Sequence, residues 1–196
     1  MNAMRYRLVI VGPSYRITGS SLRALNIWYS LRGLSRLQVE YLQVDKVVAI
    51  VPYLKTILSA DLVIVSGVNP WTAALVTFLR RLNAKETLVD FHGFSYVESL
   101  YMRGGGLYRL LLLVSEYIAY RFATYVMVAS PWLARVLRDY FGDRDIHVVE
   151  NAVSFLFQHI ADRFMRIPKD VLLRVACKTI SEDICCLLYT SPSPRD

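Results

Sequence analysis

The chain has 196 residues, of which 55% are hydrophobic and 20% are charged, and its formal net charge is +7. This length and composition fit one α/β domain with a sizeable core, and they exclude a disordered chain and two full-sized domains. The excess of basic residues predicts an anionic partner. A phosphate-bearing ligand, an anionic membrane surface and nucleic acid are all candidates.

The cysteines and the apolar stretches predict where the protein works. Cys177, Cys185 and Cys186 form neither a metal-ligand spacing nor a disulfide framework, so we expect a reducing, cytoplasmic setting. The N-terminus lacks the pattern of a secretory signal. Charged residues interrupt the apolar stretch at 107–133, which leaves no clean run near the roughly 20 residues of a membrane span. We predict no transmembrane helix.

Short apolar runs alternate with segments of helical periodicity along most of the chain. The predicted strands are residues 7–12, 39–44, 62–67, 87–93, 124–129 and 146–150. The predicted helices run from a cap at Ser20 or Ser21 to Gly33, over 71–82, over 107–122, and from the Ser130–Pro131 cap to Phe141. This alternation predicts an α/β, Rossmann-like doubly wound fold, with a mostly parallel sheet and helices on both faces.

The helix at 107–122 has an apolar stripe and one acidic residue beside it. The stripe consists of Leu107, Leu111, Val114, Ile118 and Phe122. Glu116 lies off this stripe, and we expect its side chain to be exposed or paired.

The character of the sequence changes after residue 153. We expect residues 1–153 to form the Rossmann-like domain, and 154–185 to be a linker and the start of a truncated C-terminal domain. Residues 186–196 (CLLYTSPSPRD) resemble the translation of a transposase-type sequencing adapter, so we expect a non-native tail there. On this hypothesis the natural protein continues further.

Four segments, taken in order, resemble a known family. The first is DFHG at residues 90–93, which ends a predicted strand, and the second is the helix that holds Glu116. The third is the strand ATYVMVAS at 123–130, and the fourth is IHVVENAV at 146–153. Together they resemble the N-terminal domain of the retaining GT-B glycosyltransferases of family four. The resemblance covers about residues 6–153.

The resemblance implies a hexosyltransferase-type enzyme. In its full-length form it would transfer a sugar from a nucleotide-diphosphate donor to an acceptor hydroxyl with retention, and this half would shape the acceptor side of the cleft. The donor is a substrate, and no further cofactor is expected. The implied partners are the nucleotide sugar, a sugar or lipid-linked acceptor and an anionic membrane surface, with the enzyme peripheral on the inner face of the membrane. This chain alone is expected to be inactive.

His92 is the candidate catalytic residue. A lone histidine after a strand is often structural. The place of His92 at the carboxyl end of a strand, before the flexible Gly93, makes a functional role about as well supported as a structural one. The resemblance implies that His92 faces the donor sugar and the acceptor, where an imidazole can donate a hydrogen bond to a hydroxyl. His147 and His159 have no partners at ligand spacing, so we predict no metal site.

The loop GPSYRITGSS at residues 12–21 is the candidate phosphate-binding segment. Backbone amides at the start of a helix favour an anion. In the resembling family this loop carries a Gly-Gly pair near the donor phosphates, and Gly19–Ser20 stands in that place here. Gly19, Ser20 and Gly93 are therefore the predicted donor-binding residues.

Other interpretations of the same residues remain. Asp90 lies in an apolar strand, where we expect a structural partner of a neighbouring loop, and no carboxylate is assigned a catalytic role. The main alternative function is a non-enzymatic Rossmann-like module that binds anionic lipid or nucleic acid. Nucleic acid is the less favoured ligand, because the aromatic residues are not interleaved with basic ones. A different nucleotide-dependent α/β enzyme is disfavoured, since neither GxGxxG nor a Walker lysine motif is present.

Overall fold

The structure is a computed structural model that describes residues 6–14, 19–34, 37–101 and 105–149. The predicted linker at 154–185 and the predicted non-native tail at 186–196 lie outside these residues. Within the described part no helix is long and apolar enough to cross a membrane.

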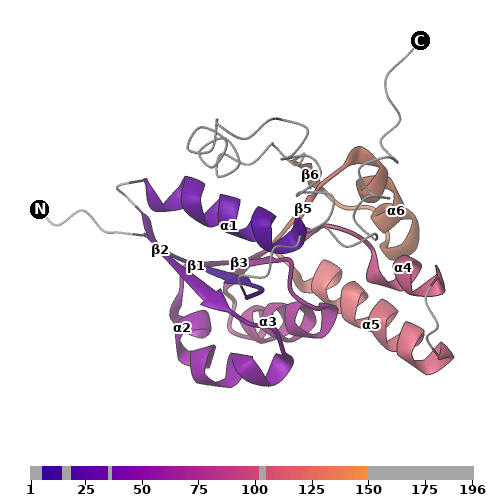
Figure 1. Cartoon of the computed structure of the whole chain (residues 1–196), viewed down its shortest axis with the longest axis horizontal. Coiled ribbons are helices and arrows are strands. Elements are labelled where there is room, and N and C mark those ends of the chain that lie inside the picture. The colour runs from indigo at the N-terminus through magenta and orange to yellow at the C-terminus, as the bar shows by residue number, and fades with distance from the viewer. Residues whose placement is uncertain (1–5, 15–18, 35–36, 102–104, 150–196) are drawn as a thin grey trace, which may run out of the picture.

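The described residues form one parallel sheet, and helices connect its successive strands along the chain (Figure 1). The strands are β1 (Tyr6–Gly12), β2 (Leu37–Gln43), β3 (Leu62–Ser66), β4 (Glu86–Phe91), β5 (Tyr125–Val128) and β6 (His147–Val148). The helices are α1 (Gly19–Arg32), η1 (Val47–Tyr53), α2 (Leu54–Ser59), α3 (Pro70–Leu82), α4 (Ser95–Tyr101), α5 (Gly106–Phe122) and α6 (Pro131–Phe141). The predicted α/β, Rossmann-like fold is confirmed.

The strand order is β2-β1-β3-β4-β5-β6, and every neighbouring pair is parallel. The chain runs from β1 outward to β2 and then returns to the other side of β1 as β3. The direction of winding therefore reverses between β1 and β3. Ligands of doubly wound sheets bind at such a switch point, outside the carboxyl ends of the strands. The loops after Gly12 and Ser66 flank this point.

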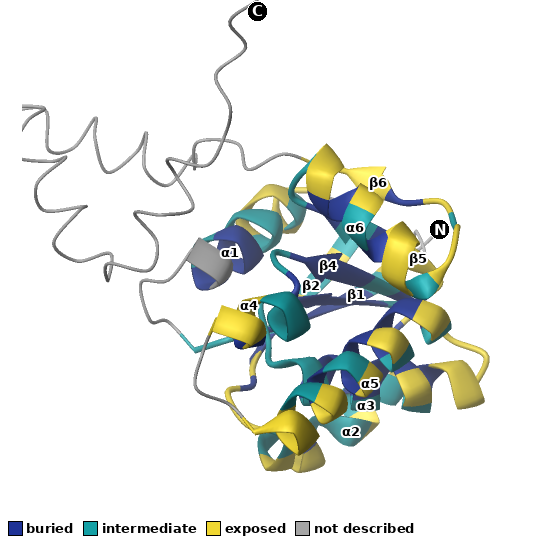
Figure 2. Ribbon diagram, turned by 90° about the vertical axis from the view of Figure 1, so that its right-hand side faces the viewer, coloured by how far each residue is buried: buried dark blue, intermediate teal, exposed yellow. Residues whose placement is uncertain are grey.

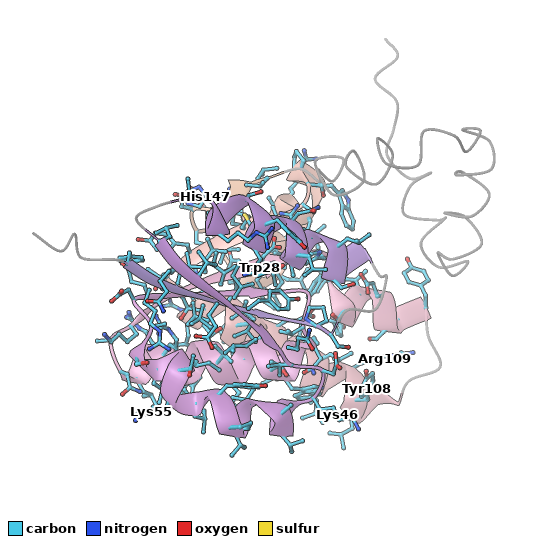
Figure 3. All side chains as sticks on the ribbon, turned by 60° about the vertical axis from the view of Figure 1, so that its left-hand side comes forward. Trp28, Lys46, Lys55, Tyr108, Arg109 and His147 are labelled. Carbon is cyan, nitrogen blue, oxygen red and sulfur yellow. The ribbon has the colours of Figure 1, made fainter. Side chains whose placement is uncertain are left out.

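The two faces of the sheet are covered unequally. Figures 1 and 2 show α1 on one side and α2, α3 and α5 on the other. On the α1 side Leu8, Ile10 and Ile64 form a small cluster, against which Trp28 of α1 packs (Figure 3). The main core lies on the opposite side, where side chains of α3, α5 and α6 pack on alternate residues of β1, β3, β4 and β5. The strands are thus buried on both faces, as their continuous apolar runs predict.

Local sequence signals place several helix ends. The side chain of Asn69 accepts a hydrogen bond from the Thr72 amide at 2.9 Å, and Pro70 follows at the first helical position of α3. Ser130 caps α6 in the same way, through the Leu133 amide at 3.2 Å. Gly142 ends that helix with a φ of 93°, which a residue with a Cβ rarely adopts.

The sequence interpretation of α1 and of three short helices needs correction. Helix α1 begins at Gly19, so Ser20 and Ser21 lie in its first turn and are not its cap. The short helices η1, α2 and α4 were not predicted. They have seven, six and seven residues, which is too short for an apolar periodicity to become visible.

The apolar stripe predicted for the helix at 107–122 is not its buried face. Leu107 is 72% exposed, and Leu111 and Val114 are also exposed. The buried residues of α5 are Leu112, Ser115, Glu116, Ala119 and Tyr120. This face mixes the small Ser115 and Ala119 with the larger Leu112, Glu116 and Tyr120. Hydrophobicity alone therefore does not decide which face of α5 is buried.

Candidate functional site

Period-two alternation and strand register bring the polar residues at the carboxyl edge of the sheet together. Ser66, the last residue of β3, is paired in register with Asp90 of β4. His92 follows β4 directly and is two residues beyond Asp90, so both side chains lie on the α1 side of the sheet. The regular sheet thus places Ser66, Asp90 and His92 next to one another.

A buried ion pair connects this edge of the sheet to α1. Arg23, one turn into that helix, donates from Nε to both Asp90 carboxylate oxygens at 3.1 and 2.9 Å. Its Nη2 donates to Oδ1 at 3.0 Å. The Arg23 side chain is 8% exposed and that of Asp90 is fully buried. This contact holds the N-terminal part of α1, with Gly19 and Ser20, beside the end of β4.

Asp90 also holds His92. The Nε2 atom of His92 lies 3.0 Å from Oδ2 of Asp90 and 3.0 Å from Oγ of Ser66. The Ser66 hydroxyl donates to the same Oδ2 at 2.7 Å. The imidazole is 19% exposed, so it is anchored at one nitrogen and still reaches solvent. We call Arg23, Ser66, Asp90 and His92 the strand-end cluster.

The charges in the strand-end cluster keep Asp90 ionised. Burial alone would raise the pKa of the Asp90 carboxyl, but the hydrogen bonds from His92 and Arg23, together with the positive charge of Arg23, outweigh burial and hold that pKa below its ordinary value. Asp90 is therefore a hydrogen-bond acceptor at neutral pH. Its partners come from α1, from β3 and, as expected, from a neighbouring loop, in which His92 follows β4.

No protein-family model matches the chain, and no curated protein matches it either.

The predicted donor-binding residues lie around this cluster. Gly19 and Ser20 begin α1, while residues 15–18 of the same loop lie outside the described part. Gly93 follows His92, and a Cβ added there would stand 2.1 Å from a carboxylate oxygen of Glu98. The Glu98 side chain therefore occupies the space beside Gly93. Donor binding by Gly19, Ser20 and Gly93 stays a prediction.

A hollow of about 500 Å³ lies near the first loop, at the carboxyl end of β2. Ser14, Asp45 and Lys46 contribute to its lining. The Ser14 amide donates to Asp45 Oδ1 at 2.8 Å, and this bond ties the first loop to the segment after β2. Among the residues that the structure describes, no group of three or more His, Cys, Asp or Glu side chains could hold a metal ion.

Glu116 is a buried carboxyl that the sequence interpretation left open. Its two oxygens accept the backbone amides of Ser95 and Tyr96 at 2.7 and 3.0 Å, so it caps the start of α4 from the neighbouring helix α5. Burial raises the pKa of Glu116 to about 7, although the amide hydrogen bonds act in the opposite direction. Because α4 begins three residues after His92, Glu116 supports the backbone of the candidate site.

Sequence reasoning singled out His92 but missed Arg23 and Ser66. Arg23 is one of many scattered arginines, and its partner lies 67 residues away. Ser66 ends an ordinary apolar strand. The sequence does show a hydroxyl residue, Ser66, and an acidic residue, Asp90, near the ends of two predicted strands. Only the strand order of the structure shows that these two strands are neighbours.

Proposed function

We propose that the described domain is the acceptor-side half of a retaining glycosyltransferase of the GT-B type. The full-length enzyme would transfer a hexose from a nucleotide-diphosphate donor to an acceptor hydroxyl. One observation carries the proposal: His92 is anchored by Asp90 and Ser66 at the carboxyl edge of the sheet, next to the N-terminal part of α1. A group that binds a hydroxyl and a helix terminus suited to a phosphate thus lie at the same edge.

The electrostatics of the site agree with this role. A sugar hydroxyl needs a polar partner with a fixed direction, and an imidazole held at one nitrogen supplies it through the other. The donor diphosphate is anionic, and the net charge of +7 favours its approach. We propose that the remaining donor contacts come from a C-terminal half.

The test uses the protein encoded by the open reading frame that genomic DNA shows around this sequence. The encoded protein is incubated with radiolabelled nucleotide-diphosphate hexoses and a panel of sugar and lipid-linked acceptors. We expect transfer with retained anomeric configuration, and a loss of about 10²-fold or more in the His92→Ala variant. The matched control is His147→Ala, whose side chain is 55% exposed on β6. Inversion, or no transfer from any donor, would contradict the proposal.

A second candidate, binding to anionic lipid, is favoured by the exposed surface of α5. Leu107 and Leu110 are 72% and 54% exposed, and Tyr108 and Arg109 lie between them (Figure 3). An apolar hollow of about 300 Å³ between α3 and α5 adjoins this surface. Exposed apolar side chains on a basic protein are typical of a helix that lies on an anionic membrane. We therefore propose peripheral binding at the inner face of the membrane, which is compatible with the transferase proposal.

Co-sedimentation with phosphatidylglycerol vesicles tests this binding. We expect the chain to bind these vesicles, to bind neutral phosphatidylcholine vesicles weakly, and to lose affinity with added salt. Leu110→Asp should reduce binding by about tenfold. Val48→Asp is the control, because Val48 is 73% exposed but belongs to η1. Equal effects of the two variants would exclude α5 as the contact surface.

A further inference from the structure

The surroundings of His92 determine which of its ring nitrogens carries the proton. The two oxygens next to Nε2, Asp90 Oδ2 and Ser66 Oγ, can only accept a hydrogen bond from it. Asp90 is an ionised carboxylate, which has no proton to donate. The Ser66 hydroxyl already donates its proton to Asp90 Oδ2, so a lone pair of Ser66 Oγ faces the imidazole. An Nε2 atom 3.0 Å from each of these oxygens must therefore bear a hydrogen.

We propose that Asp90 and Ser66 are positioning residues that hold neutral His92 in the Nε2–H tautomer, so that Nδ1 is presented as an acceptor to a ligand hydroxyl at the carboxyl edge of the sheet. Among the described residues none hydrogen-bonds Nδ1, and the imidazole is 19% exposed. The nature of the hydroxyl ligand, a sugar acceptor, rests on the proposed function, whereas the tautomer does not.

This assignment reverses the role that the sequence predicts for His92. The resemblance stated above implies an imidazole that donates a hydrogen bond to a hydroxyl. In the Nε2–H tautomer the donor is already used inside the protein, and the free nitrogen accepts. A hydroxyl that donates to Nδ1 keeps its oxygen lone pairs free to point away from His92, the orientation that a nucleophilic oxygen needs.

Arg23 completes the arrangement by fixing the rotation of the Asp90 carboxylate. Its Nη2 contacts Oδ1, and its Nε lies between the two oxygens. This two-point contact turns Oδ2 toward Ser66 and His92. The cluster stands on β3, β4 and α1, which are regular elements, so its geometry does not depend on a loop.

Nitrogen NMR of the histidine rings reads the tautomer directly, without any activity. The 196-residue chain is labelled with ¹⁵N, and long-range ¹H–¹⁵N correlations are recorded at a pH where His92 is neutral. His92→Gln identifies the His92 signals among those of the three histidines. We expect a protonated Nε2 and an unprotonated Nδ1 for His92. A protonated Nδ1 in the wild-type chain would overturn the proposal.

Two variants separate positioning from a merely structural role. Asp90→Asn replaces the acceptor by an amide that can donate, so we expect the His92 population to move toward the Nδ1–H tautomer. Asp61→Asn is the control, because Asp61 precedes β3 at the opposite edge of the sheet, and it should leave the tautomer unchanged. Ser66→Ala removes only a hydroxyl and serves if Asp90→Asn does not fold. We expect it to increase the Nδ1–H fraction, while Ser66→Thr restores the wild-type signal. An unchanged tautomer in every folded variant would contradict the positioning role.

The full-length enzyme links the tautomer to the ligand. Asp90→Asn should lower kcat by about 10²-fold with a smaller change in KM, since the acceptor still binds but its hydroxyl is no longer oriented. The control Asp61→Asn should retain kcat. An Nε2–H tautomer in a full-length protein without transfer activity would uphold the positioning of His92 and would contradict the proposed function alone. Full kcat in an Asp90→Asn enzyme with an altered tautomer would refute the role of Nδ1.

Discussion

Gly12 packs against the phenol hydroxyl end of the Tyr41 side chain. A Cβ at Gly12 would stand 2.2 Å from the Tyr41 hydroxyl oxygen and 2.6 Å from its ring carbon Cζ. The tyrosine has little freedom to move aside, because its hydroxyl donates to the Pro13 carbonyl at 2.9 Å. At this residue the absence of a side chain serves packing at the start of the first loop.

We predict that Gly12→Ala destabilises the protein by about 1–3 kcal/mol, the usual cost of overpacking. Chemical denaturation followed by circular dichroism measures this change. Gly33→Ala is the control, because among the described residues no atom beyond its chain neighbours lies within 4 Å of a Cβ added there. It should change stability by less than about 1 kcal/mol. The double variant Gly12→Ala, Tyr41→Leu should recover part of the loss. Equal losses in the Gly12 and Gly33 variants would show that Tyr41 is not the obstacle.

Glu116 makes stability depend on pH. Burial raises its pKa from the ordinary 4.5 to about 7 in the folded protein, so the folded state holds this proton more tightly than the unfolded state does. The stabilisation is complete below pH 4.5 and is lost as the pH rises through about 7. We predict that the unfolding free energy of the wild-type protein falls by up to about 3 kcal/mol as the pH rises over this range. The Glu116→Gln variant should lack most of this decrease.

Urea unfolding at several pH values between 4.5 and 8 tests the role of Glu116. Glutamine keeps a carbonyl oxygen for one of the two α4 amides, so the variant should fold. Asp139→Asn, which alters an exposed carboxylate on α6, is the control and should retain the wild-type pH dependence. A wild-type protein whose stability does not fall above pH 5 would contradict the raised pKa.

At the scale of elements, Arg80 joins α3 to the amino-terminal edge of the sheet. The side chain is fully buried. Its Nη1 donates to the carbonyls of Ile57 and Ala60 at 2.6 and 3.0 Å, and its Nη2 donates to that of Asp61 at 3.1 Å. Its Nε donates to the Glu86 carbonyl at 3.0 Å. One guanidinium thus satisfies backbone groups where α2 ends and where β4 begins.

We predict that Arg80→Ala destabilises the protein by about 3 kcal/mol or more, because several buried carbonyls lose their donor. Arg80→Lys should be intermediate, since an ammonium cannot reach all the acceptors of the planar guanidinium. The neighbouring Arg81→Ala alters an exposed side chain and should change stability by less than about 0.5 kcal/mol. Thermal unfolding compares the three, and similar midpoints for the Arg80 and Arg81 variants would refute the role of Arg80.

At the scale of the whole molecule, the sequence predicts what depends on neighbouring residues and misses what depends on strand order. The six strands, the α/β class and the Ser130 cap follow from apolar runs and local turn chemistry. The contact between Arg23 and Asp90 depends on α1 lying across β1 and β3, which no local pattern encodes. The buried face of α5 was missed because it includes the polar Ser115 and Glu116, while Leu107, Leu110 and Leu111 remain exposed.

The unequal cores of the two faces predict unequal stability within the fold. In the described part α1 covers its face of the sheet alone, on a cluster of three buried residues, whereas α3 and α5 share the main core. Local opening is easiest where little apolar surface is buried, so the amides of α1 should exchange hydrogen faster than those of α3. The buried ion pair between Arg23 and Asp90 opposes this opening.

We predict that Arg23→Met widens the difference in exchange between α1 and α3 by about tenfold or more, since it removes one partner of a buried ion pair. Hydrogen exchange with peptide-level mass spectrometry measures both helices in one experiment. Arg32→Met is the matched control, because Arg32 lies on the same helix but is exposed, over the ring of Tyr29 at 4.0 Å. If α1 were as protected as α3, or if the two variants behaved alike, the contact with Asp90 would not be what holds α1 over the strand-end cluster. A selective effect of Arg23→Met would mean that the contact with Asp90 holds α1 over its face of the sheet.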